Sequence, residues 1–201
     1  MSRSFIHHSS RRHVSIALDT TPYTTRHIGN VVHESYLQSR LVCIVSLVVI
    51  TTILDFPYPT IASLTGHTFG AGCLLALAHD YRITSTAKRY FSIPAIDLGL
   101  SFPGMGVLPR LKLTPQISRK MMLEAHRWTP NEALKDGVVD FVVPEGEIVE
   151  RAKEVAEKWK VKSKAGAYGV LRKVLWGDAG KAFREISFVH NQVVGPSKAK
   201  I

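Results

Sequence analysis

Residues 60–83 constrain the fold of this chain more than any other stretch. Thr60–Thr65 is apolar and β-branched, which predicts a short buried strand. The turn Gly66–Gly72 contains three glycines, and the apolar run Cys73–His79 after it predicts a helix. Asp80–Thr84 predicts a second strand. This strand–helix–strand order forms a crossover unit and indicates an α/β fold.

The second half of the chain predicts a helical layer from about residue 114 onward. Phe91–Met105 is expected to be a loop, because it contains two prolines and two glycines. Thr114 and Thr129 each precede a proline that suits the first helical position, and Glu132 completes a capping box. The remaining predicted elements are a strand or edge segment at Val138–Val143, a helix with Ile148, Ala152, Val155, Ala156 and Trp159 on one face, and a helix at Ala167–Trp176.

Charge and composition narrow the class of protein. Lys and Arg number 26 against 16 Asp and Glu, a net charge of +10 that suits nucleic acid, anionic membrane or a phosphorylated ligand. The basic residues are scattered and no nucleic-acid-binding motif is visible, so no nucleic-acid partner is expected. The apolar run Leu41–Leu54 is shorter than the roughly 20 residues of a membrane span, so we expect a buried helix or strand instead. Cys43 and Cys73 suggest neither a disulfide framework nor a metal site.

The glycine-rich turn has a chemical meaning of its own. A helix that begins at such a turn presents free backbone N–H groups, and these favour negative charge. Gly66, Gly70 and Gly72 match neither a phosphate loop nor a dinucleotide-binding fingerprint. Two interpretations remain open: a site for a smaller anion such as an enolate oxygen, or a turn where glycine only permits close packing.

Four segments together resemble one enzyme family. They are PTIASLTGHTFGAGCLLALAHDYRIT at 59–84, AIDLGLSFPGMG at 95–106, LEAHRWTPNEALKDGVVDFVVP at 123–144 and AYGVLRKVLW at 167–176. Their order and spacing resemble the enoyl-CoA hydratase/isomerase (crotonase) family over about residues 37–186. Within that family the chain looks most like the fungal and plant peroxisomal Δ3,Δ2-enoyl-CoA isomerases.

The resemblance implies a fold and a reaction. The implied fold is α/β and crotonase-like, a stack of ββα units with a helical C-terminal layer and incomplete N-terminal strands. The implied reaction shifts a double bond in an unsaturated fatty acyl-CoA, in β-oxidation or in secondary-metabolite side-chain synthesis, through an enolate held in an oxyanion hole. One donor of that hole falls on the N–H of Ala71. The implied substrate-binding residues are Gly66, Gly70, Gly72, Ala95 and Leu98.

The resemblance also implies partners. An acyl-CoA thioester is the expected substrate, and no cofactor is expected because CoA is part of that substrate. Members of this family usually assemble as trimers through their C-terminal layer, so a homo- or hetero-oligomer of that type is expected. Its interface would cover apolar faces such as Ile148–Trp159, although packing within the chain explains that face equally well.

The chain departs from the family pattern where acid–base chemistry is expected. Leu74 and Ala95 stand at the positions of the two glutamates used by hydratases, and neither side chain can transfer a proton. Asp97 is the nearest acid and the candidate base, while His67 and His79 are candidates only by default. Two hypotheses therefore stand: an isomerase that uses one base, and a catalytically impaired paralogue that binds acyl-CoA or joins homologous subunits.

The two ends of the chain differ from the family. Residues 1–36 show no firm pattern and are expected to form an atypical, poorly ordered segment, followed by a truncated crotonase-like domain at 37–190. No small-residue loop precedes Leu41 to supply the second oxyanion N–H, so the N-terminal part is expected to be shortened or replaced. Residues 191–201 form a tail whose ending Ala199-Lys200-Ile201 resembles a peroxisomal address. Mitochondrion, from the basic and serine-rich residues 1–18, and cytoplasm are the alternatives.

Overall fold

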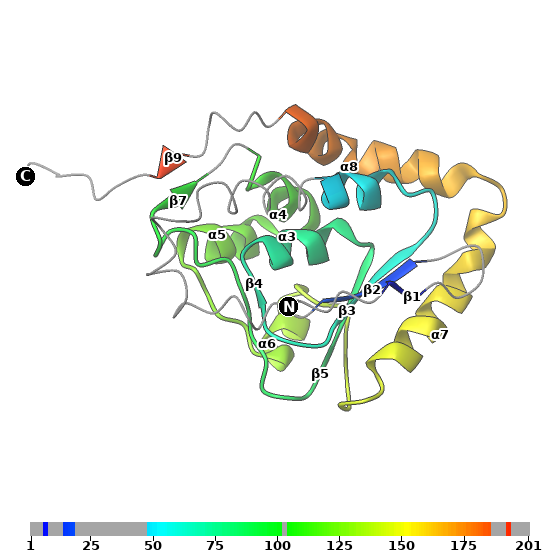
Figure 1. Cartoon of the computed structure of the whole chain (residues 1–201), viewed down its shortest axis with the longest axis horizontal. Helices are drawn as coiled ribbons and strands as arrows, with labels where there is room; N and C mark the ends of the chain where they lie inside the picture. The colour runs from blue at the N-terminus through cyan, green and yellow to red at the C-terminus, as the bar shows by residue number, and fades with distance from the viewer. Residues whose placement is uncertain (1–5, 8–13, 19–47, 102–103, 186–191, 194–201) are drawn as a thin grey trace, which may run out of the picture.

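A five-stranded sheet forms the centre of the molecule in the computed structural model, which describes residues 6–7, 14–18, 48–101, 104–185 and 192–193 (Figure 1). Its order is β1-β2-β3-β5-β8, and only the β1–β2 pair is antiparallel. The strands are Ile6–His7 (β1), Val14–Leu18 (β2), Thr60–Leu64 (β3), Tyr81–Ser85 (β5) and Phe141–Val143 (β8).

The crossover unit predicted from residues 60–84 is confirmed. Strand β3 is buried along its whole length, and helix α3 (Ala71–Ala78) carries the chain back to β5, which pairs parallel with β3. The turn between β3 and α3 contains a short strand of its own, β4 (Thr68–Phe69). β4 pairs parallel with β6 (Phe91–Ser92) and forms a separate two-stranded sheet.

The C-terminal helices follow the sequence signals from α5 (Pro115–Leu123) onward, whereas α4 (Val107–Lys112) begins before the predicted start of the helical layer at about residue 114. The others are α6 (Pro130–Lys135), α7 (Ile148–Lys160), the 3-10 turn η2 (Val161–Ser163) and α8 (Ala167–Glu185). The Thr114 side chain accepts a hydrogen bond from the N–H of Ile117, and Thr129 and Glu132 form the predicted capping box. Helix α8 continues nine residues beyond the predicted end at Trp176, because Ala179 and Phe183 remain on its buried face.

Two apolar clusters hold these layers together. The larger one lies among α3, α4 and the following helices and includes Leu77, Met121 and Trp128. The smaller one joins the sheet to α7, where Ile61 and Ile83 meet the predicted helical face. That α7 face is therefore buried within the chain.

Two short strands lie within residues 1–36, a segment in which the sequence shows no firm pattern. β2 pairs with β3 in parallel register from Val14↔Thr60 to Leu18↔Leu64. A five-residue strand has too few residues to show a clear alternation, and its partner is more than 40 residues away.

Two short strands, β6 and β7 (Leu100–Ser101), also interrupt the predicted loop Phe91–Met105. Strand β7 pairs with β9 (Gln192–Val193). Most of residues 1–36, the start of the run Leu41–Leu54 and the address Ala199-Lys200-Ile201 lie outside the described residues. The end of the apolar run lies in a helix over residues 48–55.

Candidate functional site

The turn before α3 is held in one conformation by backbone hydrogen bonds. Gly70 has φ 55° and ψ −118°, a conformation open to glycine but rarely to other residues. Its N–H donates to the carbonyl of Ser92 at 3.0 Å, and its own carbonyl accepts from the N–H of Cys73 at 3.0 Å. These bonds fix the chain direction at the point where the helix begins.

Ala71 is the first residue of α3, and it is exposed. The first N–H groups of a helix have no acceptor within the helix and lie at its positive end. The N–H groups of Ala71 and of Gly72 after it are in this position. Both therefore suit an oxyanion, and Ala71 is the more accessible because Gly72 is buried.

Cys73 supports this turn from the protein interior. Its Sγ lies 3.0 Å from the carbonyl oxygen of Thr68 and 3.1 Å from that of Ser92, so one thiol bridges β4 and β6. Burial raises the pKa of the Cys73 thiol well above its ordinary value. The thiol is therefore a structural donor and not a nucleophile.

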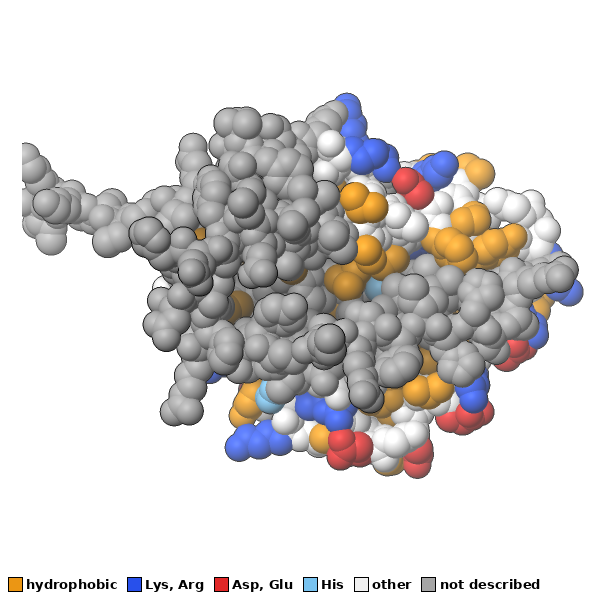
Figure 2. Space-filling view, in the orientation of Figure 1, with side chains coloured by type: hydrophobic (Ala, Val, Ile, Leu, Met, Phe, Trp, Pro, Cys, Tyr) orange, Lys and Arg blue, Asp and Glu red, His pale blue; other side chains and the backbone are white. Residues whose placement is uncertain are grey.

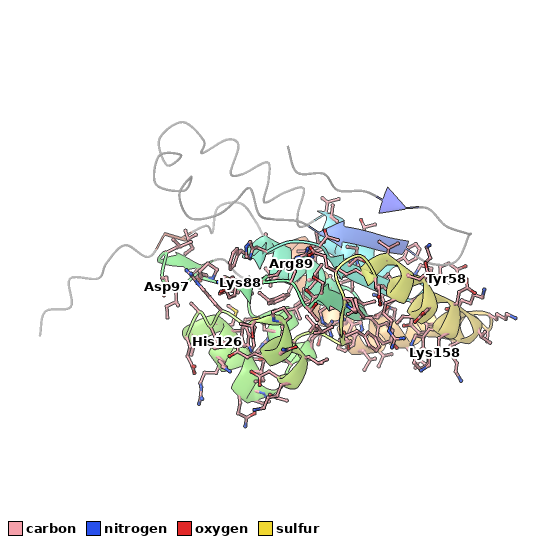
Figure 3. The ribbon with its side chains drawn as sticks, turned by 90° about the horizontal axis from the view of Figure 1, so that it is seen from below. Tyr58, Lys88, Arg89, Asp97, His126 and Lys158 are labelled. Carbon is pink, nitrogen blue, oxygen red and sulfur yellow. The ribbon has the colours of Figure 1, made fainter. Side chains whose placement is uncertain are left out.

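The two positions where hydratases carry glutamates are apolar and buried here. Leu74 and Ala95 are 2% and 8% exposed, and both belong to the larger apolar cluster. Asp97 lies outside that cluster, exposed on the turn formed by residues 94–99 (Figure 3). Leu98, on the same turn, is partly buried, and its N–H is bonded to the carbonyls of Pro94 and Ala95. The structure thus groups Leu74 with Ala95 and leaves Asp97, the candidate base, at the surface.

The two histidine candidates have structural partners. The ring of His67 stacks between Phe69 and Tyr90, and its Nδ1 accepts a hydrogen bond from the N–H of Tyr90 at 3.1 Å. His79 caps the opposite end of α3, about 12 Å from Ala71 along an eight-residue helix. It is fully buried, and burial lowers its pKa to about 4, so its ring is neutral near pH 7.

The family model described as "Enoyl-CoA hydratase/isomerase" matches residues 29–180, most of the chain. This chain belongs to the enoyl-CoA hydratase/isomerase family. The match includes the turn before α3 and every helix from α3 to α7.

Two relatives show how far the family similarity extends. Carnitinyl-CoA dehydratase of Salmonella heidelberg (strain SL476) is 39% identical over 111 residues, which are 54% of this chain and 42% of the relative. Peroxisomal enoyl-CoA delta isomerase 2 of Arabidopsis thaliana is 34% identical over 133 residues, 64% of this chain and 55% of the relative. The chain thus spans about half the length of the curated relatives it matches. A dehydratase and an isomerase match about equally well, so similarity alone does not assign the reaction.

Solved structures of family members share the fold. An enoyl-CoA hydratase from Mycobacterium ulcerans superposes with a TM-score of 0.71 over 90% of this chain and 94% of its own, at 16% identity. A family protein from Pseudomonas syringae gives 0.72 over 92% and 94%, at 17% identity. The crotonase-like fold predicted from the sequence is confirmed.

Buried ion pairs stabilise the fold around the C-terminal end of α3, the end opposite Ala71. Arg172 of α8 is 3% exposed, and its Nε lies 2.8 Å from Oδ1 of Asp80. The same guanidinium donates to the carbonyls of Ile53, Leu54 and Phe56. The Asp80 carboxylate also accepts from the N–H of Thr60 at 2.9 Å. The sequence carries no signal for this contact, because only the fold brings Arg172 to Asp80.

Lys112 and Arg82 extend this buried network. Lys112 Nζ donates to the carbonyl of His79 at 2.8 Å, and burial, with the nearby charge of Arg82, lowers the Lys112 pKa to about 7. Arg82 pairs with Asp140 at 2.9 Å. These groups lie beyond His79, at the opposite end of α3 from the candidate site, and their role is to support the fold.

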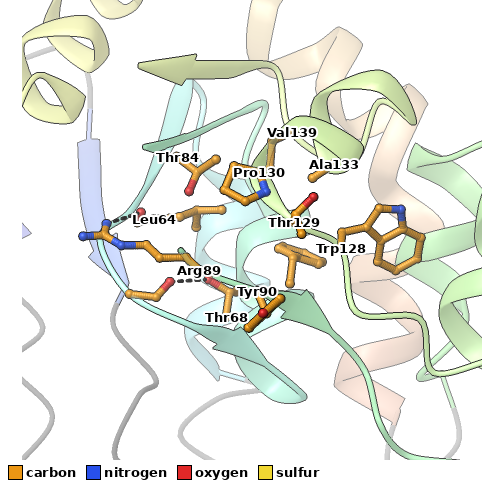
Figure 4. Close-up of a pocket in the computed structure, with 12 residues that line it drawn as sticks. Leu64, Thr68, Thr84, Arg89, Tyr90, Trp128, Thr129, Pro130, Ala133 and Val139 are labelled. Atoms are coloured by element: carbon orange, nitrogen blue, oxygen red, sulfur yellow. Dashed lines mark hydrogen bonds between the residues drawn. The ribbon is translucent and has the colours of Figure 1, made fainter. Parts of the chain in front are cut away.

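A hollow near the carboxyl ends of β3 and β5 is too small to hold a thioester (Figure 4). Its lining includes Leu64, Thr84, Arg89 and Trp128, and its volume of about 10 Å³ admits about one water molecule. Among the described residues, no helix is long and apolar enough to cross a bilayer, and no three metal-binding side chains gather.

Proposed function

We propose that this protein binds an unsaturated fatty acyl-CoA and shifts its double bond, as a Δ3,Δ2-enoyl-CoA isomerase does. The thioester carbonyl accepts a hydrogen bond from the N–H of Ala71, and removal of an α-proton produces an enolate whose oxygen is stabilised there. The observation that carries this proposal is the exposed helix start, which Gly70 and Cys73 hold in place.

The apolar side chains of Leu74 and Ala95 favour isomerisation over hydration. Addition of water by this family's two-glutamate route requires two carboxylates, and Leu74 and Ala95 replace both. A double-bond shift needs one base, which removes a proton from one carbon and returns it to another. Asp97 is the candidate for this step, and its exposed turn must then close over the substrate.

A second candidate function is acyl-CoA binding without turnover. The burial of Leu74 and Ala95 and the exposure of Asp97 favour it, because the described residues then supply the site with an oxyanion donor but place no base beside it. Such a protein would sequester acyl-CoA or serve as a subunit beside an active homologue.

One experiment separates the two functions. The full chain is given a 3-enoyl-CoA, and formation of the conjugated 2-enoyl-CoA is followed by absorbance and by chromatography of the products. Binding of a saturated acyl-CoA is measured separately by calorimetry. Turnover that is lost in Asp97→Asn, with binding unchanged, supports the isomerase. Binding without turnover supports the second function, and the absence of both refutes acyl-CoA as the ligand.

Assembly and location complete the proposal. The expected oligomer is not formed through the α7 face, because that face is buried against the sheet within the chain. Sedimentation velocity of the full chain tests for a trimer.

We also propose a peroxisomal location from Ala199-Lys200-Ile201. A fluorescent fusion that keeps these residues at its C-terminus is expected to enter peroxisomes, and the same fusion without them is not.

A further inference from the structure

Ser92 of β6 is hydrogen-bonded to the turn before α3 through its backbone carbonyl. That oxygen accepts from the N–H of Gly70 at 3.0 Å and lies 3.1 Å from Sγ of Cys73. Gly70 immediately precedes Ala71, whose N–H is the proposed oxyanion donor. The direction of that N–H therefore depends on where β6 holds the Ser92 carbonyl.

The hydroxyl of Ser92 forms a second, separate contact. Ser92 is fully buried, where an alanine would fill nearly the same space without burying a polar group. Its Oγ donates to the carbonyl of Ala125 at 3.1 Å, in the connection between α5 and α6. Ser92 thus contacts the turn with its carbonyl and the α5–α6 connection with its side chain. Because β6 has only two residues, its own ladder gives it little support, and this side-chain bond matters for its position.

Ala125 has an unusual backbone conformation. Its φ is 46°, the only positive φ at a non-glycine residue in the part of the chain that the structure describes. An alanine in this left-handed region is strained, and such strain persists where the surrounding contacts fix the chain. Ser92 supplies one of these contacts. The backbones of Phe91 and Trp128 supply two more, since each N–H donates to the other's carbonyl, at 3.1 and 3.0 Å.

The side chain of Trp128 fixes this connection to α6. Trp128 is fully buried, and its Nε1 donates to Oδ2 of Asp136 at 2.8 Å (Figure 4). The same oxygen accepts from Nζ of Lys120 at 2.9 Å, and these two hydrogen bonds hold the pKa of Asp136 below its ordinary value. Figure 2 shows charged side chains of both signs at the lower edge of the molecule, where α6 lies, so one side of this helix faces solvent while Ala133 packs in the core. The α5–α6 connection is therefore a firm support for β6.

We propose that Ser92 is a positioning residue for the oxyanion site: its hydroxyl holds β6 beside the strained connection at Ala125, and its carbonyl thereby sets the direction of the Ala71 N–H. This inference rests on the proposed isomerase function, because it assigns a role in that same site. Ser92 is buried, so it acts through Ala71 and not on the substrate. Without the hydroxyl, β6 and the turn at Gly70 sample a wider range of positions, and the N–H is less often aligned with the enolate oxygen.

A second buried serine provides a matched control for a purely structural role. Ser118 of α5 is 8% exposed, and its Oγ donates to the carbonyl of Pro109 at 2.8 Å, which joins α5 to α4. Ser92→Ala and Ser118→Ala each remove one buried hydroxyl from a bond to a backbone carbonyl. We expect both to lower the melting temperature by similar amounts.

Isomerisation kinetics of the full chain separate the two roles. Ser92→Ala is expected to lower kcat and kcat/KM for a 3-enoyl-CoA equally, by about tenfold, because a slightly displaced donor stabilises the transition state less. KM then stays within about twofold of its value in the unmodified chain. Ser118→Ala is expected to keep a near-normal kcat. An equal loss of kcat in the two serine variants overturns the proposal.

A double-mutant cycle with Ala71→Pro tests whether Ser92 acts through the Ala71 N–H. Proline removes that N–H, so adding Ser92→Ala to Ala71→Pro is expected to change kcat by less than about twofold. A further tenfold loss in the double variant would mean that Ser92 acts by another route, and it would overturn the proposal.

Hydrogen exchange of the Gly70 amide tests the positioning without any turnover. This amide is expected to exchange about tenfold faster in Ser92→Ala than in Ser118→Ala, because the turn opens locally more often once β6 is less firmly held. If the unmodified chain does not isomerise a 3-enoyl-CoA, the isomerase function is refuted, whereas the exchange measurement still decides the role of Ser92. Equal protection of Gly70 in the two serine variants overturns that role.

Discussion

Replacing Ala71 by proline removes the backbone N–H of residue 71 from the candidate site and changes little else. Proline lacks the backbone N–H, and its fixed φ suits the first position of a helix. The preceding residue must be extended, and Gly70 at φ 55°, ψ −118° has the mirror image of the extended conformation, which glycine tolerates. Because Ala71 is exposed, the ring of the introduced proline has room.

The structure gives the expected size of the effect. The Ala71 N–H has no acceptor within α3, so its loss breaks no helical hydrogen bond and changes the free energy of unfolding by less than about 1 kcal/mol. An oxyanion donor is worth about 10²–10³ in kcat, or about 3–4 kcal/mol at the transition state. Binding of a ground-state thioester changes less, by about two- to tenfold, because its carbonyl is uncharged.

The assay compares Ala71→Pro with Ala71→Ser, which keeps the N–H and serves as the matched control. Thermal unfolding of both variants is measured first, followed by isomerisation of a 3-enoyl-CoA and calorimetric binding of a saturated acyl-CoA. We expect near-normal turnover for serine and a loss of about 10²–10³ for proline. If the proline variant folds and turns over as fast as the serine variant, the Ala71 N–H is not the oxyanion donor.

Three further predictions concern the scaffold. Arg172→Met leaves a buried carboxylate unpaired and is expected to cost about 3–5 kcal/mol in urea unfolding, whereas Arg184→Met, at an exposed ion pair, costs less than about 1 kcal/mol; similar losses would contradict the role given to burial. The folded pKa of His79, about 4, lies below its ordinary 6.5, so its contribution of about 3 kcal/mol is complete above pH 6.5 and is lost as pH falls toward 4. His79→Leu should flatten that part of the stability profile, and an unchanged profile would refute the assignment. Gly169→Ala places a Cβ 2.9 Å from a proline Cβ and is expected to destabilise by about 1–3 kcal/mol, while Gly177→Ala on the same helix meets no atom within 4 Å and should stabilise by up to about 1 kcal/mol.

The elements that the sequence predicts correctly are those whose causes are local. The strand at Thr60–Leu64, the turn and the helix after it are specified by apolar runs and glycines within 25 residues. The starts of α5 and α6 are specified by Thr-Pro pairs within four residues. The role of Ala71 comes instead from the family resemblance, because the apolar run by itself predicts a helix only from Cys73, two residues after α3 begins.

The features that the sequence does not predict depend on distant partners. Strand β2 needs β3 beside it, and Arg172 meets Asp80 across 92 positions. Helix α8 continues past Trp176 because the core accepts its later turns, and no local signal marks that extension. The environment of Asp97 is of the same kind, since the direction of a side chain on an irregular turn is set by tertiary packing.

The Arg172 contacts also have a consequence for biosynthesis. The guanidinium contacts residues 53–60 and Asp80, but it belongs to a helix that begins only at Ala167. During synthesis Asp80 therefore leaves the ribosome long before Arg172. Until α8 emerges, Asp80 has no arginine to pair with, and burying it alone is costly. The growing chain is therefore expected to remain open at this end of the sheet and to close late. A transcript that ends before codon 172 would yield a polypeptide that resists compaction and is an early target for proteases.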